Sequence, residues 1–174
     1  GWLPADIPAI TEREDLCGVV GYWKLDGDGS DTTGKHSGVV TKALPTTGRF
    51  GDSSGALAFA PNSNVLPPYS ADFDLQQFSL EAWIRYSAND PAPSTSDQIV
   101  GNTDGGGYAL TVDEGNLNLI TYFEDLPVHE ALAVPLPPGA TDRWLHIAGS
   151  YGSGEMRLYV DGYIAAAKYV GKPV

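Results

Sequence analysis

An acidic, glycine-rich loop carries the residues of this chain best suited to hold a metal ion. Three carboxylates, Asp26, Asp28 and Asp31, are separated by glycines, and Gly34 closes the run. Carboxylates at such short spacing can converge on one hard cation, and glycines let backbone carbonyls join them. The run lacks the Glu that an EF-hand needs at its twelfth position. It therefore predicts either a calcium site or a solvent-exposed turn rich in Asp and Gly.

A second set of residues has the chemistry of a sugar-binding surface. Sugars stack their apolar faces on aromatic rings and form hydrogen bonds through their edges. Five residues share one parity on alternating segments, opposite the aliphatic residues: Trp83, Trp144, His146, Arg157 and Tyr159. They predict a ligand-binding outer face of one sheet. Tyr69, on another loop that is expected to lie near the acidic run, is an equal rival as a ligand-binding residue.

Catalytic patterns are missing from the sequence, which predicts that the chain is not an enzyme. Glycoside hydrolysis needs two carboxyl groups about 5–10 Å apart. Glu81 is the one carboxylate of its segment, FSLEAWIRY, and the sequence has no nucleophile elbow, zinc pattern or phosphate-binding loop. His146, on an alternating segment, is read more readily as a structural histidine than as a catalytic one.

Charge and composition narrow the partners. The formal net charge is −12, from 22 acidic and 10 basic residues, without a basic run. Nucleic acid and anionic membrane surfaces are therefore unexpected partners, because both are bound by clustered cations. No apolar stretch is long enough to cross a membrane.

Short alternating segments predict an all-β fold. About nine or ten of them, separated by Gly- and Pro-rich turns, indicate an antiparallel sandwich of two sheets. In the clearest one, Phe78, Leu80, Ala82 and Ile84 should face the core, together with Leu158 and Val160. Residues 1–17 read as a linker or extended arm, with an optional short helix at 11–16, and residues 18–174 as one domain.

Five motifs in order resemble a known superfamily. They are GYWKLDGDGSDTTG, GRFGDSSGALAF, FSLEAWIRY, RWLHIAGSY and MRLYVDGYI, spread over about residues 18–170. They resemble the concanavalin A-like lectin/glucanase superfamily in its laminin-G-like branch. The resemblance implies a jelly roll of secreted or cell-surface proteins, often with calcium in the loop where Thr33 stands in place of the usual Ser. The Glu-X-Asp-X-X-Glu run of the superfamily's laminarinase-like enzymes is not found.

The resemblance also implies further strands after residue 174, including one beside the first strand. We predict a strand at Val19–Leu25, apolar and uncharged until Lys24, which would leave a long open edge if unpaired. The chain is therefore expected to lack its last strands. The Val19–Leu25 strand should then be paired by that missing C-terminal segment or by another subunit, and Cys17 could find its partner there.

These observations predict a non-catalytic extracellular recognition module of a larger secreted or surface protein, with calcium as cofactor. A glycan is the favoured ligand and a protein ligand remains open. The alternative is a structural, assembly or adhesion domain of an extracellular complex. A polysaccharide-degrading enzyme is the least favoured reading.

Overall fold

The computed structural model describes residues 18–86, 97–103, 107–122 and 129–171. The chain divides into two compact units, Gly1–Asp72 and Phe73–Val174. The expected arm at 1–17, its optional helix and Cys17 lie outside the described residues. In the described part, no helix has the length and apolar character to cross a membrane.

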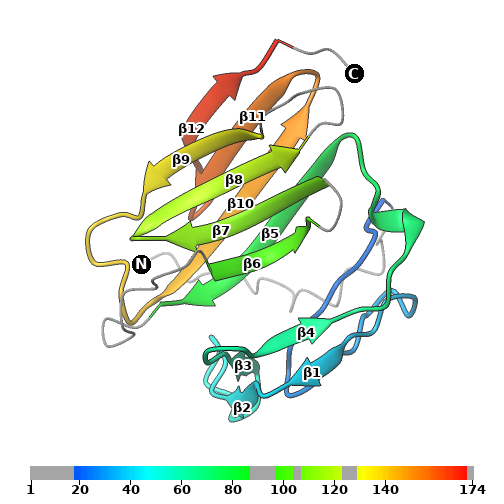
Figure 1. The fold of residues 1–174 in the computed structure, drawn as a ribbon. Helices are drawn as coiled ribbons and strands as arrows, with labels where there is room; N and C mark the ends of the chain where they lie inside the picture. Colours follow the sequence, from blue (N-terminus) through cyan, green and yellow to red (C-terminus); the bar gives the residue numbers. More distant parts are fainter. Residues whose placement is uncertain (1–17, 87–96, 104–106, 123–128, 172–174) are drawn as a thin grey trace, which may run out of the picture. The chain divides into compact units, whose positions relative to one another are not determined.

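The second unit is a sandwich of two antiparallel four-stranded sheets (Figure 1). One sheet has the order β12-β11-β10-β5 and the other the order β6-β7-β8-β9. The strands are β5 (Phe78–Arg85), β6 (Asp97–Asn102), β7 (Gly107–Asp113), β8 (Asn116–Tyr122), β9 (Glu130–Pro135), β10 (Trp144–Gly152), β11 (Glu155–Val160) and β12 (Tyr163–Tyr169). The predicted all-β fold of two antiparallel sheets is confirmed.

Alternation of burial builds the core between these sheets. Leu145 and Ile147 on β10 and Leu158 on β11 are fully buried, and they pack with Leu110 on β7 and Leu119 on β8. The predicted inward face of β5 is confirmed, since Phe78 is buried and its alternate neighbours pack against the core while those between them are exposed.

Two features of β10 and β5 tighten this core. Gly149 faces the other sheet so closely that an added Cβ would lie 2.9 Å from the Leu119 Cδ1 atom. The Phe78 ring stacks on Tyr108 with centroids 4.2 Å apart. Burial is the first cause that raises the pKa of Tyr108, whose hydroxyl donates to the Phe73 carbonyl at 2.9 Å.

Tight turns set the hairpin registers of this unit. Glu114 and Gly115, Ser153 and Gly154, and Asp161 and Gly162 all have positive φ, as a type I′ turn requires. These turns place Asp113 opposite Asn116 and Val160 opposite Tyr163. The register of β11 with β12 shifts between Leu158 and Tyr159, which leaves Ala165 as an extra, unpaired residue.

The first unit is built from short pieces. Two two-stranded sheets pair β1 (Val39–Thr41) with β4 (Asn64–Leu66) and β2 (Leu44–Thr46) with β3 (Ala56–Ala58), and the 3-10 helix η1 (Ala71–Phe73) follows. β1 and β2 are separate strands because Lys42, between them, has a φ of 56°. β4 was not predicted from the sequence.

The predicted strand Val19–Leu25 is wrong for the described part of the chain. Within it, Trp23 makes only an isolated bridge to Asp31. The reason lies in the backbone bonds of Tyr22, since its N–H donates to an Asp31 carboxylate oxygen at 2.8 Å and its carbonyl accepts from Thr32 N at 2.7 Å. Residues 31–32 therefore take up the backbone groups of Tyr22 on one side of this segment. Pairing of this segment with sequence beyond this chain stays a prediction.

Candidate ligand-binding surfaces

Asp31 organises the acidic loop of the first unit. Its buried carboxylate accepts backbone N–H bonds from Tyr22 (2.8 Å), Thr33 (2.9 Å), Lys35 (3.2 Å) and His36 (2.9 Å), and also the Thr33 hydroxyl. Burial alone would raise the pKa of this carboxyl. The hydrogen bonds from Thr33, Tyr22 and His36 outweigh burial and hold the pKa well below its usual range.

The neighbours of Asp31 extend this network. The Trp23 indole N–H donates to the His36 carbonyl at 2.8 Å, and the buried His36 ring lies 3.2 Å from the Asp72 carboxylate. The carboxylate therefore joins the start of the described chain to the 31–36 turn. We call this set of contacts the Asp31 network.

Asp26, Asp28 and Asp31, the three carboxylates predicted to bind calcium, do not form a metal-holding cluster in the described part of the chain. Asp28 is exposed and accepts from Ser30 N at 2.8 Å, a bond that lowers its pKa, and Gly34 has a φ of 79° in the turn that follows. Among the described residues, no group of three or more acidic, His or Cys side chains is placed to hold a metal. A calcium ion here would rely on Asp26, the open side of Asp28 and backbone carbonyls, so calcium stays a prediction.

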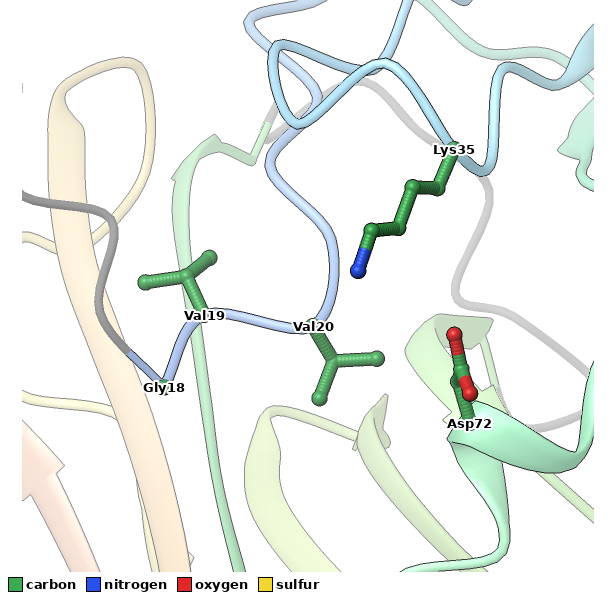
Figure 2. Close-up of a pocket in the computed structure, with 5 residues that line it drawn as sticks. All are labelled: Gly18, Val19, Val20, Lys35 and Asp72. Carbon is green, nitrogen blue, oxygen red and sulfur yellow. The ribbon is translucent and has the colours of Figure 1, made fainter.

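A hollow of about 390 Å³ lies beside the Asp31 network (Figure 2). Its lining includes Val20, Lys35 and Asp72, and Figure 2 shows the Lys35 ammonium and the Asp72 carboxylate directed toward the same space. Opposite charges of equal number offer no net charge to an ionic ligand. The hollow begins at Gly18, at the limit of the described residues.

The second unit does bring the predicted aromatic set together on one face. Trp83 on β5 pairs with His146 on β10, and Arg85 pairs with Trp144. On the other side of β10, Ala148 pairs with Tyr159 and Ser150 with Arg157. All five predicted residues therefore lie on the face of the β12-β11-β10-β5 sheet that points away from the core. We call this the Trp83 face.

Its centre combines one ring with polar groups. The Trp83 side chain is 45% exposed, and its ring lies 5.1 Å from the His146 ring, centroid to centroid. The His146 Nε2 atom is 3.5 Å from the Glu81 carboxylate. Arg157 is held by hydrogen bonds to Glu155 and Tyr159, which raise the pKa of its guanidinium in that order of size.

Sequence reasoning missed two groups of residues in this unit. Glu81 was noted only as an isolated carboxylate, although its parity with Trp83 was a usable signal. A cleft at the β11–β12 turn, with Arg143, Asp161 and Tyr163 in its lining, was not predicted. Tyr69, the predicted rival, is 81% exposed in the first unit.

Fold and surface together define a two-sheet β-sandwich of the jelly-roll type with a polar-aromatic outer face. The sequence profile of the concanavalin A-like lectin/glucanases superfamily matches residues 59–173, more than half of the chain. The chain belongs to this superfamily, as a laminin-G-like domain. No curated protein matches the chain in sequence.

Solved structures share this fold at low identity. Domain 4 of AbnA, an extracellular GH43 arabinanase from Geobacillus stearothermophilus in complex with arabinotriose, has a TM-score of 0.62 at 19% identity, over 89% of this chain and 77% of that domain. The binding domain of botulinum neurotoxin serotype D has a TM-score of 0.59 at 17% identity, over 81% of this chain and 36% of that one.

A third structure concerns botulinum neurotoxin type C, whose cell entry is described as dependent on two ganglioside molecules. It has a TM-score of 0.59 at 12% identity, over 87% of this chain and 39% of that one. The chain thus spans about two fifths of the neurotoxin chains it matches. At these identities the likeness shows the fold alone.

Proposed function

We propose that this chain is a non-catalytic carbohydrate-binding module of a larger secreted or cell-surface protein. The observation that carries the proposal is the exposed Trp83 ring, set among hydrogen-bonding side chains on the outer face of the sandwich. A ring on a sheet is held in place by its strand neighbours, so a sugar meets a surface that is already formed.

The chemistry of the Trp83 face suits a neutral sugar. The apolar C–H face of the sugar would lie on the Trp83 ring, where stacking adds to the burial of apolar area. The Glu81 carboxylate would accept from hydroxyls, and His146 and Arg157 would donate to them. Groups of both kinds within one patch match the mixed donor and acceptor character of a hydroxyl.

The comparisons support this reading without deciding it. The arabinanase domain is described in complex with arabinotriose, and the neurotoxin type C work concerns gangliosides. A related neurotoxin binding domain is described in complex with rat synaptotagmin II, so a protein ligand stays the second candidate. The arabinanase is extracellular, which supports an extracellular location for this chain as well.

Absence of catalysis is part of the proposal and has its own test. The superfamily includes glucanases, whereas β5 carries Glu81 as its single carboxylate. We expect no hydrolysis of β-1,3- and β-1,4-glucans over a day, measured as released reducing ends. Turnover that disappears in Glu81→Gln would promote the enzyme reading.

The binding test uses a matched pair of aromatic substitutions. Trp83→Ala should weaken binding to neutral oligosaccharides at least about tenfold, or 1.4 kcal/mol, in calorimetric titrations with arabinotriose, cellohexaose and laminarihexaose. Tyr122→Ala removes a similarly exposed ring, 41% exposed, from β8 of the other sheet, and should leave binding unchanged. Wild-type protein that binds none of these sugars, or equal losses in both variants, would reject the proposal.

A further inference from the structure

A cleft of about 350 Å³ opens at one end of the sandwich of the second unit. It lies where β9 ends and the β11–β12 hairpin turns, and Figure 1 shows the end of β9 and the start of β12 at the same end of this unit. Its lining includes Pro135, Pro137, Arg143, Asp161, Tyr163 and Ile164. Its volume falls at the small end of the range for ligand pockets, roughly 300–1,000 Å³.

The hairpin turn places an open aromatic ring at this cleft. Asp161 and Gly162 form the tight turn, so Tyr163 starts β12 directly opposite Val160. Val160 packs against the core, whereas Tyr163 is 80% exposed and Ile164 64% exposed. Two large apolar side chains thus stay in water beside a formed concavity.

The polar part of the cleft is fixed in position by the backbone. Asp161 accepts His146 N at 3.1 Å through Oδ1 and Arg143 Nη1 at 3.0 Å through Oδ2. Arg143 also donates through Nε to the Gly139 carbonyl at 3.2 Å. Both side chains are open to solvent, with exposures of 42% for Arg143 and 38% for Asp161.

This arrangement selects a neutral ligand. The Arg143 charge is balanced by Asp161, and the chain as a whole carries −12, so an acidic sugar would gain nothing and meet repulsion. A guanidinium beside a carboxylate offers one donor and one acceptor to adjacent hydroxyls. The ring of Tyr163 offers a stacking surface at the same cleft.

We propose that the Tyr163 cleft is a second saccharide site, separate from the Trp83 face, which takes one or two units of a neutral sugar. The ring of Tyr163 stacks on the sugar, and Arg143 with Asp161 binds two of its hydroxyls. The cleft extends the carbohydrate-binding function proposed above, and the two sites can succeed or fail independently because they use different side chains.

The test follows each site by its own signals. Backbone amides of Asp161 and Gly162 and the Trp83 indole N–H are monitored by NMR during titration with arabinotriose, cellotriose and laminaritriose. At least one trisaccharide should shift the Asp161 and Gly162 amides. Tyr163→Ala should weaken that response at least tenfold while the indole response stays, and Trp83→Ala should do the reverse.

A matched control lies on the same strand. Tyr169→Ala removes another exposed ring of β12, 68% exposed, and should leave the cleft response intact. Unchanged melting of all three variants checks that they fold. Indole shifts without amide shifts at Asp161 and Gly162 would overturn the cleft and leave the Trp83 face standing. The cleft proposal is also overturned if the Asp161 and Gly162 amide shifts persist in Tyr163→Ala, or if Tyr163→Ala and Tyr169→Ala weaken them equally. If the sugars shift neither these amides nor the indole signal, both proposals are rejected.

Discussion

Different interactions stabilise the interior of each of the two units. The second unit buries leucine, isoleucine, methionine and aromatic side chains between its sheets, many with no exposed surface. In the described part of the first unit, the buried apolar residues are Ala43, Ala56 and Leu57, each 8% exposed, beside buried Asp31 and His36. Burial of apolar side chains stabilises the second unit, whereas hydrogen bonds to the Asp31 carboxylate stabilise much of the first.

This difference predicts which substitutions and which pH changes destabilise each unit. Burial of apolar area is spread over many residues and depends little on pH near neutrality. A network on one carboxylate depends on a single side chain and on its ionisation. Stability measurements on matched variants can therefore tell the two apart.

The largest effect is expected in the sandwich core. Leu158→Ala removes a side chain with no exposed surface and leaves a cavity between the sheets, so it should lower the free energy of unfolding by about 2–5 kcal/mol. Leu66→Ala, at a position 67% exposed in the first unit, should change it by less than about 0.5 kcal/mol. Denaturant melts measure both, and equal losses would contradict the comparison.

The next effect concerns the Asp31 network. Asp31→Asn turns an acceptor into an NH₂ group that faces backbone donors, so local stability should fall by about 3 kcal/mol, the equivalent of one or two bonds to a charged group. Hydrogen exchange at the Tyr22 and His36 amides measures this loss directly. Asp28→Asn, at an exposed site with one backbone bond, should leave the exchange rates nearly unchanged.

The same carboxylate predicts a pH dependence of known sign. Its pKa is lower in the folded state than the unfolded value of about 3.9. Its stabilising contribution is therefore complete above about pH 5 and is lost as pH falls below about 4 toward the folded pKa. The stability gap between wild type and Asp31→Asn should be constant from pH 5 to 8 and shrink in acid. A gap that grows in acid would contradict the network.

A smaller loss of stability is expected where an added methyl group overfills the closely packed core of the sandwich. Gly149→Ala places a Cβ against Leu119 and Leu110, so it should destabilise the protein by about 1–3 kcal/mol. Gly152→Ala, on the same strand, meets only the flexible Gln77 side chain and should cost less. If the two variants melt alike, the sheets have more room than the structure indicates.

Calcium gives the smallest predicted effect. An ion at Asp26 and Asp28 should stabilise the protein by mass action, by about 1.4 kcal/mol at ten times its Kd. Calorimetric titration and melting with and without chelator measure it, and Asp26→Asn should abolish the effect. No heat and an unchanged melting curve would assign this loop to the Asp31 network alone.

Sequence reasoning worked where burial alternates with period two. β5, β8 and β10 of the second unit could be predicted because each turns one face to the core, as Leu145, Ile147 and Gly149 do on β10. It failed at Val19–Leu25 and at β4 because their backbone partners are loop atoms and short ribbons, which leave no periodic pattern.

The candidate sites could also be predicted only in part. Parity placed Trp83 and His146 on one face, but not their register as direct neighbours or the approach of Glu81 to His146. The Tyr163 cleft could not be predicted at all, because it forms only when the end of β9 meets a hairpin nearly 30 residues later in the chain.

The extra residue in β12, Ala165, lies between the start of the strand at the hairpin tip and the part that packs on the core. Pairing is regular on both sides of Ala165, so its deletion would leave Ala166 opposite Leu158 and Ile164 opposite Tyr159. What would change is the strong local twist that a bulge imposes, and with it the direction of the hairpin tip. Deletion of Ala165 should therefore change the direction of the hairpin tip at the Tyr163 cleft while Ala166 stays opposite Leu158.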